Sequence, residues 1–310
     1  KILMKNWEAQ GVVLSEHAIY PNQEITAKKI VSNITVVPTF IDLIGEDHIS
    51  DKDLVRRIKN FNYHEQTIFT VHYALSGPPQ WRTADYDEGI LRSWMGYFGG
   101  ETTDEMKKYA QAIIDREIYP EIYANWYLPT LADPTQAPTG CHVTQAWIDM
   151  PGEPLKWKHG PLGGKHSFMD IKNVLADQIT DAYERYAPGF KKQILNRYIY
   201  SPLEQERNNP SAIQGCWAGG SVIPEQFYDK RPVPGVCVGG GARTFLKNLY
   251  LSNSIHPFGI TPLGSGYIAA CEVAEDMGAR EQGWWTSKAT HWYLENAANI
   301  PLDLGVRRSS

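Results

Sequence analysis

Three pieces near the end of the chain have the types and spacing needed to hold an anionic or flat ligand. Leu249–Leu251 is a short apolar strand candidate, the motif His256-Pro257-Phe258-Gly259 follows it, and Gly264-Ser265-Gly266 opens a helical pattern. A helix start presents free backbone N–H groups and the positive end of the helix dipole. Glycines at that point let a ring or a phosphate approach the backbone closely. The pattern therefore predicts a cofactor site between this strand and this helix.

Two other interpretations of the same residues bear on this prediction. The spacing Gly264-x-Gly266-x-x-Ala269 matches a loose dinucleotide pattern. We reject that interpretation because the preceding loop is too long and no second strand with a ribose-binding acid follows at about 20 residues. The small residues could equally serve tight helix packing, so the residues alone leave ligand binding and packing both open.

The flanking residues predict how the site would be positioned. Thr261 and Pro262 read as an N-cap followed by proline at the first helical position, and Gly278 ends a helix over residues 264–277. At the other end of the chain, residues 1–5 and 10–14 read as a hairpin, and residues 25–31 as a third strand. A chain that opens inside a hairpin leaves a sheet edge without a partner. We therefore expect an N-terminal polypeptide that this sequence lacks.

The middle of the chain predicts a sheet flanked by helices. Apolar and β-branched runs predict strands, and Thr102-Thr103-Asp104-Glu105 is a capping box that predicts the start of a helix. A single face of apolar residues predicts a second helix that ends before Pro188-Gly189. The predicted elements are a helix over residues 51–60, strands at Thr67–Leu75 and residues 141–149, and a helix over residues 170–186. The fold class is accordingly α/β (α+β).

Composition excludes several classes of protein. The 310 residues carry a formal charge of −5 without a basic stripe, which argues against a nucleic-acid partner. Four dispersed cysteines fit a reducing compartment, so we expect a cytoplasmic protein, with peripheral membrane contact as an option. No apolar run approaches the roughly 20 residues of a membrane span. The 10 Trp and 17 Tyr indicate large apolar or amphipathic contact surfaces.

Other chemistry-bearing residues carry weaker expectations. His159, His166 and the pair Cys141-His142 lack zinc-like ligand spacing, so no metal site is predicted. The absence of a Gly-x-Ser-x-Gly elbow disfavours an esterase serine. His64 and His72 could act as an acid or base in a substrate pocket. We expect instead a surface loop for His64 and strand packing for His72.

The aromatic pairs after the final helix have two interpretations. Trp284-Trp285 and Trp292-Tyr293 could form a docking surface for a partner or a membrane. They could equally belong to an extra helix that packs on the body. The sequence leaves both open.

The order of several motifs resembles the C-terminal part of the phytoene desaturase-like, FAD-dependent oxidoreductases, relatives of the amine oxidases. The resemblance runs over most of the chain and is specific in its order. It rests on Ile30-Val31-Ser32-Asn33, residues 39–45, residues 71–79, Ala146-Trp147, residues 186–190, residues 201–207, residues 231–235, residues 243–251 and the His256-Pro257 motif.

The resemblance implies FAD as the cofactor and a cofactor contact near the flavin ring. The positions that match the family's loop and helix start beside the ring are Asn253, His256, Pro257, Phe258, Gly259, Thr261, Pro262, Leu263, Gly264 and Gly266. The family's Rossmann unit is not in this chain. Phe258 and Ile260 stand where the family has glycines, and Asn253 replaces another. No catalytic residue is assigned.

The resemblance also implies a domain plan and a set of partners. Residues 1–33 and 215–280 would form part of a FAD-binding domain that lacks its N-terminal Rossmann unit, residues 34–214 an inserted substrate domain, and residues 281–310 an extension. Expected partners are a polypeptide with the pyrophosphate-binding half, an apolar substrate and an electron-transfer protein.

The expected activity is that of a FAD-dependent dehydrogenase or desaturase, or a water-dependent hydroxylase, acting on an isoprenoid C–H bond. Two-subunit enzymes that act on monoterpenes such as limonene would fit a half-chain of this kind. A non-catalytic scaffold subunit and an oxidase that uses molecular oxygen are the alternatives.

Overall fold

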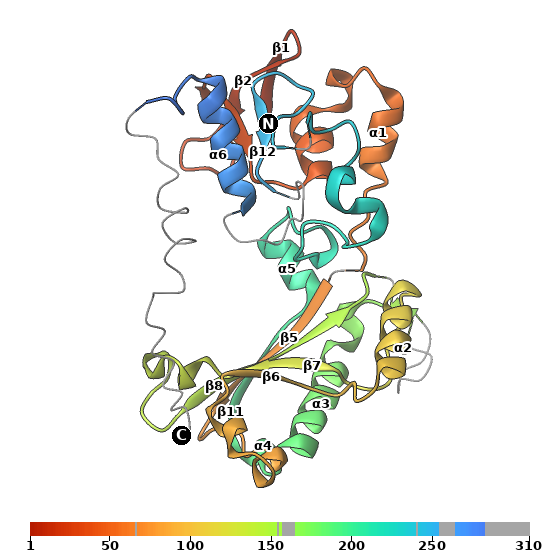
Figure 1. Cartoon of the computed structure of the whole chain (residues 1–310), viewed down its shortest axis with the longest axis vertical. Helices are drawn as coiled ribbons and strands as arrows, with labels where there is room; N and C mark the ends of the chain where they lie inside the picture. Colours follow the sequence, from red (N-terminus) through yellow and green to blue (C-terminus); the bar gives the residue numbers. More distant parts are fainter. Residues whose placement is uncertain (66, 154, 157–164, 240, 254–263, 283–310) are drawn as a thin grey trace.

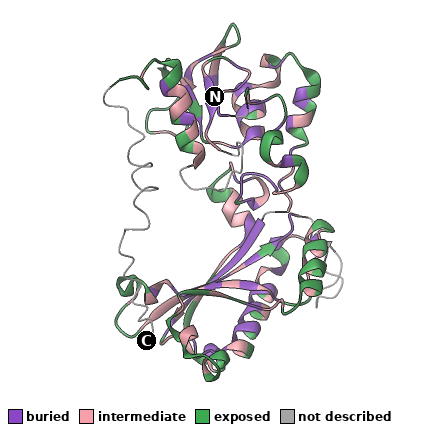
Figure 2. Cartoon of the chain, viewed as in Figure 1, coloured by how far each residue is buried: buried purple, intermediate pink, exposed green. Residues whose placement is uncertain are grey.

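The computed structural model describes residues 1–65, 67–153, 155–156, 165–239, 241–253 and 264–282. These residues form two bodies, stacked along the long axis of the molecule (Figure 1). Each body has its own buried core (Figure 2). The chain passes between the bodies near the start of β5 and again around the short helix α5.

The upper body holds two small sheets. β1 (Ile2–Lys5), β2 (Glu8–Val13) and β3 (Glu24–Thr26) form an antiparallel sheet in that order. β4 (Ile30–Ser32) pairs in parallel with β12 (Leu249–Leu251), which is fully buried. The expectation of one strand over residues 25–31 is therefore wrong. The chain leaves the first sheet after β3 and enters the second at β4, so a single strand cannot serve both.

Two helices cover the upper body. α1 (Lys52–Lys59) is capped by Asp51, whose carboxylate accepts from the amides of Asp53 and Leu54. α6 (Gly264–Asp276) follows β12 in sequence, and its Glu272 accepts hydrogen bonds from the amides of Ala242 and Arg243. The core of this body includes side chains from residues 36–63, which the expected domain plan assigns to the substrate domain. That plan stays a prediction.

The lower body is built on a five-stranded antiparallel sheet in the order β11-β5-β8-β7-β6. The predicted strand Thr67–Leu75 is confirmed as β5, and the strand predicted over residues 141–149 is confirmed as β8 (His142–Met150). The remaining strands are β6 (Met95–Phe98), β7 (Ala124–Tyr127) and β11 (Ile194–Tyr200), and a separate pair is formed by β9 (Leu155–Lys156) and β10 (Lys165–His166).

One face of this sheet is buried under α3 (Phe168–Tyr186), the helix predicted over residues 170–186. Tyr183 anchors the contact: its ring stacks on Phe190 with the ring centroids 4.2 Å apart, and its hydroxyl lies 3.2 Å from that of Thr144. Burying an aromatic side chain with its hydroxyl satisfied contributes strongly to a core. α3 therefore fixes which face of the sheet is closed.

Three further α-helices belong to the described part of the lower body. The capping box predicted at Thr102 is present at the start of α2 (Thr103–Ile114). α4 (Phe190–Gln193) and α5 (Pro202–Asn208) flank β11 in the chain. No helix in the described part of the chain combines the length and apolarity needed to cross a bilayer.

Candidate substrate groove and cofactor edge

The sheet face away from α3 is open and forms the candidate substrate site. Because successive strand residues alternate between faces, Phe69, Val71 and Tyr73 enter the core, whereas Thr70 and His72 point to the open face. The register sets the open-face residues in rows across the strands. One row consists of Tyr198, His72, Gln145 and Tyr127. The neighbouring row consists of Tyr200, Thr70, Trp147 and Asn125.

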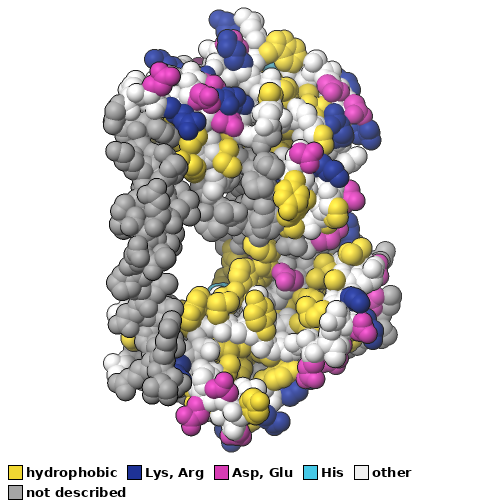
Figure 3. Space-filling model, viewed as in Figure 1, with side chains coloured by type: hydrophobic (Ala, Val, Ile, Leu, Met, Phe, Trp, Pro, Cys, Tyr) yellow, Lys and Arg dark blue, Asp and Glu magenta, His cyan; other side chains and the backbone are white. Residues whose placement is uncertain are grey.

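Two adjoining cavities lie on this face. The larger, of about 460 Å³, is lined by Ala74 and Val143 among others, and the smaller, of about 240 Å³, by Trp147 and Trp217. His72 and Gln145 line both. Figure 3 shows hydrophobic side chains gathered in the hollow between the two bodies, above the sheet. The cavities together form a groove, which we call the sheet groove, along strands β11, β5 and β8.

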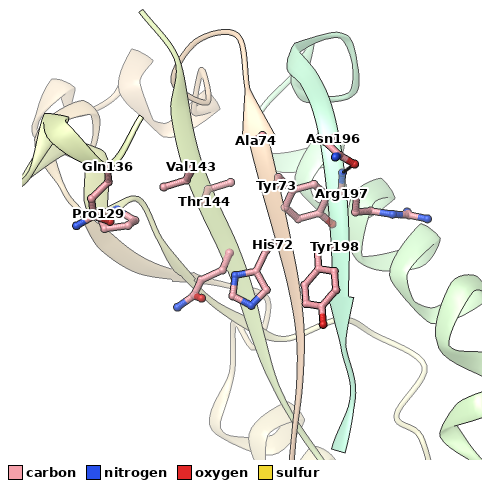
Figure 4. Close-up of a pocket in the computed structure, with 11 residues that line it drawn as sticks. His72, Tyr73, Ala74, Pro129, Gln136, Val143, Thr144, Asn196, Arg197 and Tyr198 are labelled. Atoms are coloured by element: carbon pink, nitrogen blue, oxygen red, sulfur yellow. Dashed lines mark hydrogen bonds between the residues drawn. The ribbon is translucent and has the colours of Figure 1, made fainter. Parts of the chain in front are cut away.

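The described lining of the sheet groove offers no free charge. Arg197 is its one ionised side chain, and its guanidinium donates to Asp177 on α3 at 2.7 Å. In the close-up, Arg197 is directed away from His72 and Tyr198 (Figure 4). A site that is mainly apolar, with a few neutral polar groups, suits an uncharged ligand.

His72 differs from its sequence expectation. Strand packing is expected, but the side chain points from β5 to the open face beside Tyr198, with the two ring centroids 6.2 Å apart (Figure 4). Partial burial lowers the pKa of His72. The lowered pKa favours the neutral imidazole, whose two nitrogens offer one donor and one acceptor.

Two tryptophans form the end of the sheet groove nearer the upper body. Trp147 on β8 and Trp217, which follows α5 in the chain, have ring centroids 5.7 Å apart. Trp217 comes shortly after a turn in which Gln214 (φ 55°) and Gly215 (φ 74°) both adopt left-handed backbone. Gly215 also lies against Pro202: a Cβ on Gly215 would stand 2.5 Å from the Pro202 backbone. This tight turn sets the position of Trp217.

Replacing Gly215 by alanine should destabilise the protein by about 1–3 kcal/mol more than replacing Gly189, because overpacking adds to the backbone strain. Gly189 is a matched control: its φ is 89°, but nothing lies within 4 Å of a Cβ there. Urea unfolding of the two variants measures the difference. Equal free energies of unfolding would show that the Pro202 contact does not constrain the turn.

The predicted cofactor site begins at the carboxyl ends of the parallel strands β4 and β12; we call this region the cofactor edge. There the Ser252 amide donates to Ser32 O at 2.9 Å, and Asn253 Nδ2 donates to Asn33 O at 3.3 Å. Gly264 and Gly266 lie in the first turn of α6, and a Cβ on Gly266 would meet no atom of the described residues within 4 Å. The other predicted residues lie outside the described residues: His256, Pro257, Phe258, Gly259, Thr261, Pro262 and Leu263.

The other histidines considered in the sequence, His64 and His142, do not line the sheet groove. His64 lies in a turn, as the expected loop requires, but its side chain is half-buried, and burial together with the nearby Arg116 lowers its pKa. Its Nδ1 is buried without a hydrogen-bond partner among the described residues. His142 Nδ1 lies 2.9 Å from the Thr130 hydroxyl, and no group of three or more metal-ligating side chains occurs in the described ranges.

Two sequence predictions concern residues whose side chains the structure does not describe. His159 and the aromatic pairs Trp284-Trp285 and Trp292-Tyr293 lie outside the described residues, and the side chain of His166 is likewise not described. The metal and docking interpretations at these positions stay predictions.

Sequence reasoning does not single out Gln145, Tyr198 or Trp217. Gln145 sits in an alternating run, CHVTQAWID, whose polar and apolar faces are readable. Which polar face is open depends on the pairing with β5 and on α3 covering the other side. Trp217 carries no such signal, because the turn at Gln214 and Gly215 brings it to the groove.

The curated proteins that are similar to this chain in sequence include two named for oxidation–reduction. The chain is 25% identical over 295 residues to a subunit of the limonene dehydrogenase of Castellaniella defragrans, covering 92% of this chain and 51% of that protein. It is 36% identical over 155 residues to pyridine nucleotide-disulfide oxidoreductase domain-containing protein 2 of Rattus norvegicus, covering 48% of this chain and 24% of that protein. No family model matches.

The fold is shared with a solved structure. An oxidoreductase from Methanosarcina mazei superposes with a TM-score of 0.51 at 14% identity, covering 89% of this chain and 48% of that one. The chain spans about half the length, or less, of the curated relatives it matches. The mixed α/β architecture is thus shared with that solved structure, and the chain is homologous to two proteins named for oxidation–reduction.

Proposed function

We propose that this chain is the substrate-binding part of a FAD-dependent dehydrogenase or desaturase that acts on a C–H bond of an apolar, isoprenoid molecule. The observation that carries the proposal is the sheet groove, a neutral, aromatic-walled site in a homologue of a limonene dehydrogenase subunit. An uncharged isoprenoid offers no charge to recognise, so shape and apolar contact must hold its skeleton.

The chain's own residues would bind and orient the substrate. Trp147 and Trp217 supply flat apolar surfaces at one end of the sheet groove, and Ala74 and Val143 leave space at the other. Removing a hydride from an unactivated or allylic carbon benefits from a site closed to water. The described lining holds no ionised group free to act as a strong base, which agrees with a reaction in which the cofactor carries the chemistry.

The cofactor edge is compatible with a flavin. Ser252 and Asn253 follow β12, Gly264 and Gly266 lie at the start of the 13-residue helix α6, and no atom of the described residues lies within 4 Å of a Cβ on Gly266. When bound, FAD supplies the hydride-accepting chemistry. The N-terminal end of α6 would favour negative charge on the ring through the helix dipole.

The parallel pair β4–β12 supports the need for a second polypeptide. Parallel sheets are normally covered on both faces, yet Val31 in the middle of β4 is 48% exposed. The chain also covers only 51% of the related limonene dehydrogenase subunit. We infer that a further polypeptide stretch with the pyrophosphate-binding half, in the same protein or in a partner, covers β4.

Flavin content tests the proposal. The complex should be purified from its host with wild-type chain and with Gly266→Trp, which places an indole at the start of α6. The wild-type complex should show the absorbance of oxidised flavin, lose it anaerobically on addition of a monoterpene hydrocarbon, and retain less flavin in the variant. Equal flavin content in both would contradict a cofactor contact by this chain. Turnover that requires oxygen would favour an oxidase instead.

A scaffold role is the second candidate. The side-chain amide of Asn253 donates a hydrogen bond to Asn33 O. The family that the chain resembles has a glycine at this position. With its amide engaged in this hydrogen bond, Asn253 would stabilise the fold and would not contact a cofactor. A complex whose flavin content and turnover do not depend on this chain would establish that role.

A further inference from the structure

The centre of the sheet groove holds a pair of polar side chains from neighbouring strands. His72 on β5 and Gln145 on β8 are directly opposite each other in the strand register, and both line both cavities. On one side of this pair lie Ala74 and Val143, and on the other lie Thr70 and Trp147. A polar pair therefore sits between two mainly apolar compartments.

The hydrogen-bonding groups of this pair are not used within the described part of the chain. His72 makes a ring contact with Tyr198, and no side-chain hydrogen bond involves His72 or Gln145 among the described residues. Polar groups left in an apolar site lose affinity for ligands that cannot satisfy them and favour ligands that can. His72 and Gln145 should therefore discriminate between ligands that can form hydrogen bonds with them and ligands that cannot.

The pair His72 and Gln145 carries no net charge when the imidazole is neutral. Burial lowers the pKa of His72 and so favours its neutral form, and Gln145 carries no charge. Arg197, the one ionised residue of the described lining, is paired with Asp177. An anionic carboxylate would enter without a free cation to meet it, which is costly in an apolar site. A neutral hydroxyl or carbonyl oxygen fits instead.

We propose that His72 and Gln145 together bind one neutral oxygen of the ligand, so that the sheet groove takes an oxygen-bearing isoprenoid, an alcohol or a ketone, in preference to the parent hydrocarbon. The hydrocarbon skeleton extends to both sides, toward Trp147 and toward Val143. The proposal deepens the proposed function and rests on it, because it assumes that the sheet groove is the substrate site.

The test compares ligands with the same ring and different oxygen content. Menthane, menthol and menthone compete against the neutral dye Nile red for the purified full chain or its complex. Menthol or menthone should bind three- to tenfold more tightly than menthane to the wild type. The double variant His72→Phe/Gln145→Met keeps the size of both side chains and should abolish that preference, because menthane then binds more tightly and the two oxygenated compounds lose their hydrogen bonds.

Tyr198→Phe is the matched control, because it removes a hydroxyl from the same row of the sheet and leaves the pair intact. It should retain the preference, and the single variants His72→Phe and Gln145→Met should each weaken it. A preference that survives the double variant, or is lacking in the wild type while all three compounds bind, would overturn this proposal alone. Failure of every compound to displace the dye would overturn the proposed function as well.

Discussion

Replacing Val143 by tryptophan should lower the affinity of this chain for a monoterpene hydrocarbon such as limonene at least tenfold. Val143 faces Ala74 across the strand pair and lines the larger cavity of about 460 Å³. An indole at that position would occupy the space in which the skeleton of the ligand lies. Tenfold corresponds to about 1.4 kcal/mol, well within the cost of displacing a buried apolar contact. Displacement of Nile red by limonene measures the affinity.

Leu195→Trp provides the control for this substitution. Leu195 is on β11, is 61% exposed and lies outside the lining of both cavities. The control should bind limonene as the wild type does and should have the same circular dichroism spectrum as Val143→Trp. If Val143→Trp folds and binds limonene normally, the hydrocarbon does not bind in the larger cavity.

Replacing Val31 by aspartate should abolish assembly with the polypeptide stretch that we infer to cover β4. Val31 is half-exposed at the centre of a two-stranded parallel pair, whose partner strand β12 is fully buried. A carboxylate placed under a covering layer would lose its hydration, which costs several kcal/mol. Co-purification of tagged wild-type and variant chains, followed by mass spectrometry, measures the association.

Tyr86→Asp is the matched control for assembly, because Tyr86 is 96% exposed and lies in the lower body. It should copurify with the same polypeptide as the wild type. A Val31→Asp chain that retains a full complement of that polypeptide would show that the interface lies elsewhere.

The strands and helices with strong local signals could be predicted from the sequence. Thr67–Leu75 is β-branched and aromatic, and Thr102 and Glu105 form a reciprocal cap, so local chemistry determines these elements. Residues 25–31 could not be predicted correctly, because β3 and β4 belong to different sheets. Pairing with distant residues, above all that of β4 with Leu249–Leu251, separates them.

The sheet groove needs tertiary information that no local pattern holds. Alternation in β5 places His72 on the face opposite to that of Phe69 and Val71, but only the position of α3 determines which face is closed. The expectation of packing for His72 is wrong for that reason. Trp217 reaches the groove through two successive left-handed residues, which a sequence pattern does not reveal.

The crystal structure of this chain with the polypeptide that copurifies with it, soaked with limonene, tests the central claim most directly. We expect the hydrocarbon to lie on the open face of the five-stranded sheet, in contact with Trp147 and Val143, and a flavin ring to bound the groove from the side of α6. A sheet face filled by ordinary side chains of the second polypeptide, with the hydrocarbon bound elsewhere, would contradict it.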